Sequence, residues 1–213
     1  MRRIFLFAAI VLAAGLAWAQ AKPTTMRIVG EGITAHIAFE KGVKMTLTSK
    51  PTPVRPDTYW TLAMSLFKKD DKGRTWEMRS NGAFGGFANV TVDAEQDKVL
   101  LLGKPVGIMV EGKPAEDPPG NNVIAVSIVL MGQSGEQYFP WAFLDGKHTM
   151  PSAAVKDENG KVLAAGVCQI REGRYAWFTW KYPPGWRGKF DVDAQVFLGP
   201  FEAKPSKAVT PFQ

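Results

Sequence analysis

The strongest constraint on the fold is the rhythm of short apolar segments along the chain. Beyond the N-terminal segment, apolar runs recur about every ten to fifteen residues between Gly, Pro, Asn or Asp, and none has the 3.6-residue period of a helix. With no helix to cross between parallel neighbours, we predict an all-β fold of antiparallel sandwiches. The expected strands are 25–29, 33–39, 43–48, 58–68, 74–79, 87–92, 98–102, 106–111, 123–131, 137–143, 153–157, 161–170, 174–182 and 189–198.

Turn-forming residues agree with this interpretation. The chain has 21 Gly and 15 Pro in 213 residues, which is more than a helical bundle tolerates and typical of many short strands joined by turns. Residues that tolerate a positive φ lie where hairpins are expected to turn. The segments concerned are 70–73, 144–146 and 157–160.

Residues 1–19 have the three parts of a secretory signal peptide. Arg2 and Arg3 make the start positive, the run from Ile4 to Leu16 is apolar and uncharged, and Ala17-Trp18-Ala19 fits the rule for signal peptidase. The run is shorter than the about 20 residues that cross a bilayer. We expect an exported bacterial protein, periplasmic or extracellular, that begins at Gln20 and has no transmembrane segment.

Charge and cysteine content narrow the partners and cofactors. The formal net charge is +6, and it is spread through mixed segments such as Lys68–Lys72, so we do not expect a nucleic-acid partner. Cys168 is the one cysteine and therefore has no intramolecular disulfide partner. It lies in the apolar stretch 163–170, where a buried small hydrophobe is expected.

The chain also resembles itself. At an offset of 62 residues, 62–66 aligns with 124–128, and Trp76 aligns with Tyr138. At an offset of 63, the segment 92–103 aligns with 155–166. Alternating apolar residues do not explain the matched Gly and Lys positions, so we predict an internal duplication.

The duplication predicts two related sandwiches that meet near Gly103-Lys104. The N-terminal sandwich would span 20–103 and the C-terminal sandwich 104–213, where seven strands suffice for an immunoglobulin-type sandwich. The alternative is one large sandwich in which the segment 111–122, rich in Pro, Gly and Asp, forms a long surface loop.

The C-terminal half resembles a known kind of domain. The stretches Gly173–Trp177 and Pro183–Val192 look like the last two strands of immunoglobulin-like or fibronectin type III-like domains of exported bacterial proteins. The resemblance implies a module that binds, spaces or braces other modules. Such domains share no catalytic residues, so it assigns no site, and the cysteine pair of antibody-type domains is missing here.

The sequence lacks the residue patterns of a blue-copper site and of a hydrolase nucleophile elbow. A blue-copper site needs a His and a Met shortly after the Cys, but His36 and His148 both precede Cys168 and no Met follows it. Ser134, in a Gly-rich segment near Asp145 and His148, resembles a nucleophile turn, but no helix follows to form a nucleophile elbow. We therefore expect no cofactor, no metal and no catalytic residue.

The C-terminal aromatic residues supply the candidate site. If 174–182 and 189–198 form a hairpin, pairing Tyr182 with Lys189 turns Tyr175, Trp177 and Thr179 toward the core. The opposite face would then be an amphipathic platform for a sugar ring or a partner protein. Its residues would be Phe178, Trp180, Tyr182, Trp186, Asp191 and Asp193. A one-residue shift in register would exchange the two faces.

Three functions follow from these observations. The first is an exported, non-catalytic binding or structural protein of the bacterial cell envelope, whose partner is an envelope protein or a glycan. The second is a carbohydrate-binding module that uses the same face. The third is a hydrolase with an unrecognised site. If the platform is exposed, replacing Trp180 with Ala should leave the fold intact.

Overall fold

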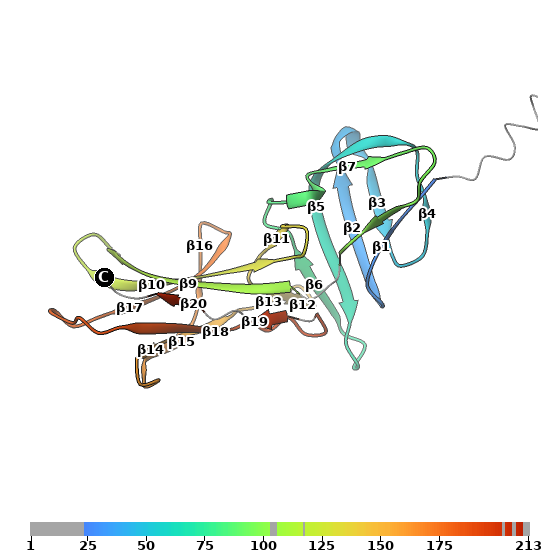
Figure 1. Ribbon diagram of the computed structural model, residues 1–213. Helices are drawn as coiled ribbons and strands as arrows, with labels where there is room; N and C mark the ends of the chain where they lie inside the picture. The colour runs from blue at the N-terminus through green and yellow to red at the C-terminus, as the bar shows by residue number, and fades with distance from the viewer. Residues whose placement is uncertain (1–23, 103–105, 117, 202, 206–207, 211–213) are drawn as a thin grey trace, which may run out of the picture.

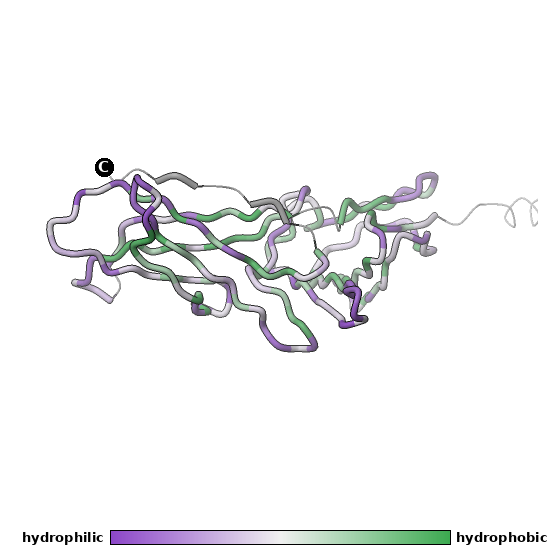
Figure 2. Tube along the Cα trace, turned by 90° about the horizontal axis from the view of Figure 1, so that it is seen from below, coloured by the Kyte–Doolittle hydropathy of each residue, from purple (hydrophilic) through white to green (hydrophobic). Residues whose placement is uncertain are grey.

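The computed structural model describes residues 24–102, 106–116, 118–201, 203–205 and 208–210. The expected signal peptide 1–19 and the expected boundary at 103–104 lie outside these ranges. The fold is all-β, as predicted, and helical structure in the described ranges is limited to the single turns η1 (Glu40–Gly42) and η2 (Gly85–Phe87). Figure 2 shows hydrophobic residues along the strands and hydrophilic residues at the turns.

Two sheets form the N-terminal half of the molecule, to which the later strands β12 and β13 also contribute. A three-stranded sheet has the order β4-β1-β8, with β4 (Thr52–Pro53), β1 (Thr25–Ile28) and β8 (Lys98–Leu100). A seven-stranded sheet has the order β13-β12-β6-β5-β2-β3, and β7 also pairs with β5. Its strands are β13 (Lys147–Thr149), β12 (Ala142–Leu144), β6 (Thr75–Arg79), β5 (Asp57–Lys69), β2 (Ile33–Phe39), β3 (Lys44–Leu47) and β7 (Asn89–Val92).

Two further sheets form the C-terminal half (Figure 1). The order β16-β17-β10-β9-β19, with β11 (Gln137–Tyr138) on β10, makes a six-stranded sheet of β16 (Gln169–Arg171), β17 (Tyr175–Lys181), β10 (Asn122–Met131), β9 (Val106–Glu116) and β19 (Ala203–Pro205). The order β15-β14-β18-β20 makes a four-stranded sheet of β15 (Val162–Val167), β14 (Ser152–Asp157), β18 (Phe190–Gln195) and β20 (Ala208–Thr210). The pairs β1–β8 and β9–β19 are parallel, and the other strand pairs are antiparallel.

Three expected segments differ from the observed elements. The segment 161–170 is two strands, because the chain leaves the four-stranded sheet after Val167 and joins the other sheet as β16. The segment 137–143 contains β11 and the start of β12, which pair in different sheets. The long loop expected at 111–122 in the one-sandwich alternative is wrong, because β9 continues to Glu116, where it pairs with Asn122. Backbone pairing with β10 outweighs the turn-like composition of that segment.

The two halves of the predicted duplication agree at one hairpin and differ at another. In the first half Lys69 pairs with Thr75, and 62 residues later Met131 pairs with Gln137 in the same register. At the offset of 63, however, β14 pairs with β15, whereas β7 pairs with β5 and β8 pairs with β1. The duplication therefore stays a prediction.

A main-chain contact joins the two halves. The loop Asn81–Phe87 lies against the turn between β10 and β11, where the N–H of Gly86 donates to the carbonyl of Ser134 at 2.7 Å and the N–H of Gln137 donates to that of Ala83 at 2.7 Å. The hairpin of β12 and β13 extends the seven-stranded sheet of the first half through β6. Buried residues of both halves consequently form one core cluster.

Glu136 is a buried carboxylate at this junction. Its oxygens accept hydrogen bonds from the N–H of Ser134 at 2.9 Å and from the hydroxyl of Tyr138 at 3.2 Å. Burial nevertheless raises the pKa of Glu136, and burial together with the neighbouring carboxyl raises the pKa of Tyr138 well above its ordinary value. The junction between the two halves thus contains a buried hydrogen-bonded pair, Glu136 and Tyr138.

Replacing Gly85 with Ala tests how much the main-chain contact between the two halves contributes to stability. Its φ is +52°, and a Cβ built there would lie 2.4 Å from the carbonyl carbon of Gly135, so Gly85→Ala forces the two halves apart. Gly32 has a φ of +69° and nothing within 4 Å, so Gly32→Ala carries the backbone strain alone. Urea denaturation should show a loss of about 1 kcal/mol for Gly32→Ala and more than about 3 kcal/mol for Gly85→Ala. Equal losses would contradict the role of the contact.

The predicted hairpin turns are confirmed. Gly73, Gly160, Asp145 and Gly146 have positive φ. In the turn after β5, the Asp70 carboxylate accepts hydrogen bonds from two backbone N–H groups, from the Arg74 side chain and from Trp76 Nε1 at 3.0 Å. The indole bond, followed by the bonds from Arg74, lowers the pKa of Asp70 to about 2 against the opposing effect of burial.

The lowered pKa predicts a pH-dependent contribution to stability. Because the folded protein prefers the ionised Asp70, its contribution is present above the ordinary value of 3.8 and is lost as the pH falls toward about 2. We expect Asp70→Ala to unfold at a lower temperature than wild type near neutral pH, and the difference to shrink below about pH 4. Asp157→Ala is the matched control, because the Asp157 carboxylate accepts two backbone N–H bonds in its turn but, among the described residues, none from an indole or an arginine side chain. Calorimetry across pH measures the unfolding temperatures of both variants and of wild type. A difference between Asp70→Ala and wild type that stays constant across pH would contradict the lowered pKa of Asp70.

Candidate functional site

The hairpin on which the predicted site depends is wrong. β17 pairs with β10 and β16 in the six-stranded sheet, whereas β18 pairs with β14 and β20 in the four-stranded sheet. The segment 182–189 therefore crosses from one sheet to the other. Strong pairing partners on both sides of β17 leave no edge at which β18 could add.

The two faces of β17 are consequently exchanged. Ala176 is fully buried, and Phe178 and Trp180 pack against the core. Phe178 reaches the opposite sheet, where a Cβ built on Gly166 would lie 3.0 Å from its ring. Tyr175 is 40% exposed, so the face expected to be the core faces outward.

Four aromatic rings fill one end of the space between the two sheets. Trp186 lies 5.3 Å from Trp180, 5.7 Å from Tyr182 and 6.3 Å from Phe190, measured between ring centroids. Trp180, Tyr182 and Trp186 are partly buried and pack against the core. These rings, which we call the end cluster, close the sandwich and leave no open stacking platform of the kind predicted.

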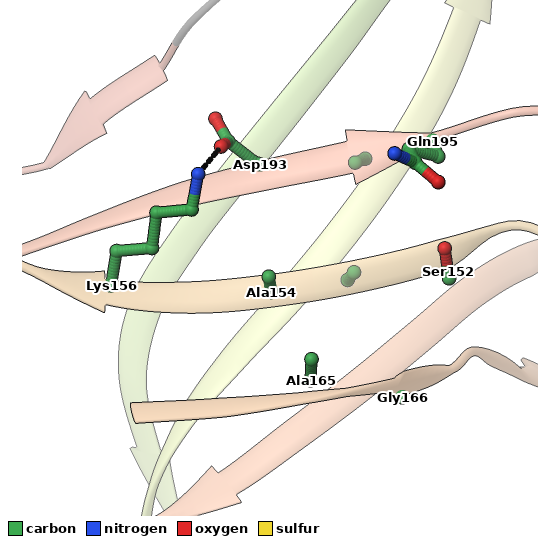
Figure 3. A pocket seen from close by; sticks show the side chains of 9 residues that line it. Ser152, Ala154, Lys156, Ala165, Gly166, Asp193 and Gln195 are labelled. Carbon is green, nitrogen blue, oxygen red and sulfur yellow. Dashed lines mark hydrogen bonds and ion pairs between the residues drawn. The ribbon is translucent and has the colours of Figure 1, made fainter. Parts of the chain in front are cut away.

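The two predicted acids lie elsewhere, on the outer face of the four-stranded sheet. Asp193 forms an ion pair with Lys156 of the neighbouring strand, and the pair borders a hollow of about 290 Å³ with Ala154 and Ala165 at its floor (Figure 3). Asp191 is exposed on the same strand. The structure therefore separates Asp191 and Asp193 from the aromatic side chains with which they were grouped.

A different aromatic hollow lies on the outer face of the six-stranded sheet. We call it the Trp177 hollow; its volume is about 410 Å³. Strands β9, β10, β16 and β17 supply its lining residues, together with the turn after β16. They are Ala115, Glu116, Ser127, Arg171, Glu172, Tyr175 and Trp177.

Cross-strand pairing positions the functional groups of the Trp177 hollow. Arg171 pairs with Tyr175 across β16 and β17, and Trp177 pairs with Ser127 across β17 and β10. The guanidinium carbon of Arg171 lies 4.6 Å from the centroid of the Trp177 ring, which is cation–π geometry. Glu116 and Glu172 add carboxylates at the wall. The site thus combines aromatic surface with charges of both signs.

The sequence pattern of β17 predicted the wrong inner face for a physical reason. Both faces of β17 carry aromatic side chains, Tyr175 and Trp177 on one and Phe178 and Trp180 on the other. Alternation alone cannot tell which face is buried. The small Ala176 on the inner face was the available signal, because a crowded core favours a small residue beside large rings.

The residues considered for metal or nucleophilic chemistry are engaged in other contacts. His36 lies 4.6 Å from the Phe67 ring and His148 lies 4.8 Å from the Phe143 ring. Cys168 is buried, as predicted, and burial raises the pKa of its thiol to about 11, which disfavours the reactive thiolate. In the described ranges, no group of three or more His, Cys, Asp or Glu side chains is placed to hold a metal ion.

Comparison of the chain with models of known protein families, with curated proteins and with solved structures found no match. The described part of the chain contains no helix with the length and apolar character needed to cross a membrane. The geometry of the Trp177 hollow is therefore the main guide to function.

The exchange of faces reverses the expected effect of replacing Trp180. Because Trp180 packs in the end cluster, Trp180→Ala should lower the free energy of unfolding by about 2–4 kcal/mol. Trp177→Ala removes a ring from the outer face and should cost less than about 1 kcal/mol. Urea denaturation of the two variants measures the difference, and equal losses would contradict the assignment of faces.

Proposed function

We propose that this protein is an exported, non-catalytic binding protein of the bacterial cell envelope, and that the Trp177 hollow is its contact surface. The N-terminal pattern of residues 1–19 supports export. The observation that carries the binding role is the outward-facing group Tyr175, Trp177 and Arg171 beside a hollow of about 410 Å³. Tyr, Trp and Arg are the residue types that dominate the energy of protein interfaces.

The position of Arg171 favours a protein partner. A sugar ring binds by stacking on the flat face of an aromatic ring, but the guanidinium of Arg171 lies over Trp177 at 4.6 Å. The same stacking holds the guanidinium in a defined place and makes a mixed aromatic and polar surface of the kind found in protein interfaces. We therefore expect a protein surface or an extended peptide.

A glycan is the second candidate. The carboxylates of Glu116 and Glu172 beside Tyr175 are groups that accept hydrogen bonds from sugar hydroxyls. Binding of this kind would use Tyr175, or would require Arg171 to leave the Trp177 ring.

Strand order supports an immunoglobulin-like unit as the scaffold. Counting β9 as strand A and β10 as B, then β14 to β18 as C, C′, D, E and F, and β20 as G, gives the orders A-B-E-D and C′-C-F-G. Apart from the additional β19 beside strand A, the first order resembles the ABED sheet of a constant-type immunoglobulin sandwich, and the second resembles its CFG sheet with the C′ strand of the variable type. Because that fold serves many functions, the role is argued from the Trp177 hollow and not from the scaffold.

Binding to envelope fractions tests the proposal. Labelled wild-type protein should co-sediment with envelopes of the producing bacterium, and Trp177→Ala and Arg171→Ala should each weaken binding by about tenfold or more. Thr179→Ala is the matched control, because Thr179 is the next outward residue of β17 and does not line the hollow. Circular dichroism establishes that each variant is folded.

Treating the envelopes separates the two candidates. Binding that protease treatment abolishes supports a protein partner, and binding to protein-free peptidoglycan or to a glycan array supports the second candidate. Wild-type binding that Trp177→Ala leaves unchanged would overturn the assignment of the surface.

A further inference from the structure

Strand β15 is an edge strand with unusual chemistry. It ends the four-stranded sheet, so its pairing partner is β14 and its other side has no strand among the described residues. From Val162 to Ile170 the sequence contains no charged residue and no proline. Such an edge presents unpaired backbone donors and acceptors, which proteins normally protect against pairing with another chain.

Most other strands at the ends of sheets in this protein are protected. Strands β3, β4, β8, β13 and β16 each contain a lysine, an arginine or a proline, the residues that discourage edge-to-edge pairing. They are Lys44, Pro53, Lys98, Lys147 and Arg171. Strand β15 lacks such a residue, as do β7 and β20, but β15 is the longest of these three, with six residues.

The outward side chains of β15 are apolar and exposed. Val162 is 51% exposed and Val167 is 67% exposed, the highest value among the large hydrophobic residues in the described ranges. Ala165 lies between them and borders the hollow shown in Figure 3. Water contacts this apolar surface in the single chain, and burying it would be favourable.

We propose that β15 pairs antiparallel with β15 of a second copy of this chain, around a two-fold axis at Gly166. The two four-stranded sheets would then join into one continuous sheet. Since the strand is uncharged, the symmetric arrangement brings no like charges near one another across the axis. An isologous contact of this kind is the commonest way in which identical chains associate.

The side chains of β15 complement themselves in this register. Residues directly opposite in an antiparallel pair lie on the same face, so pairing at Gly166 places Val167 of one copy beside Ala165 of the other, on the outer face. The larger side chain covers the smaller one twice, once on each side of the axis. On the inner face Gly166 leaves room for Phe178, so the axis adds no side chain where the core is already filled.

Sedimentation velocity of the purified protein over about a hundredfold range of concentration measures the association. We expect a dimer for wild type and a dissociation constant at least about tenfold weaker for Val167→Lys and for Ala165→Lys, because each substitution places two lysines beside the axis. Val99→Lys is the matched control: Val99 is 38% exposed on β8, an edge strand that already contains Lys98. Its association should equal that of wild type.

Hydrogen exchange of the wild-type protein provides a readout that needs no variant. Amides of residues 164–167 should exchange more slowly at high protein concentration, and amides of the protected edge β3 should not change. A wild-type protein that stays monomeric throughout, or a dimer unaffected by Val167→Lys, would overturn the proposal. Envelope binding through the Trp177 hollow does not depend on either result, so the two proposals fail separately.

Discussion

The architecture depends on the close main-chain contact between the loop Asn81–Phe87 and the turn that joins β10 to β11. Gly85 lies so near Gly135 that a side chain there would collide with backbone, and the N–H of Gly86 donates to the carbonyl of Ser134. Backbone groups that meet at this distance fix the position of both partners. The same turn holds the buried Glu136, so the contact joins the polar interior of one half to the main chain of the other.

Consequences of this junction extend to the C-terminal sheets. The turn fixes the C-terminal end of β10. On the inner face of this strand, Ile124, Val126 and Ile128 have no exposed surface. Because β10 lies between β9 and β17, its register places the inner and outer faces of both neighbours. Trp177 therefore faces outward for a reason that begins more than forty residues earlier in the chain.

Some features could be predicted because they depend on neighbouring residues. Asp70 and Asp157 form their turns with backbone groups two and four residues away, and the segments 33–39 and 123–131 show strand alternation within their own lengths. The pairing partners of a strand, in contrast, do not follow from its neighbouring residues. The candidate site was misplaced because β17 and β18 are close in sequence yet belong to different sheets, and local alternation says nothing about which strand lies beside which.

The sequence by itself determined that this chain forms strands and turns, that Cys168 is buried, and that aromatic residues near the C-terminus dominate one region. Those properties follow from side-chain size, polarity and short-range hydrogen bonding, which the order of residues contains directly. Tertiary structure alone decided that Trp180 closes the core while Trp177 faces outward, and that β15 ends a sheet without a charge. Both outcomes depend on which distant strand supplies the next row of backbone hydrogen bonds, and that choice is made by packing over the whole core.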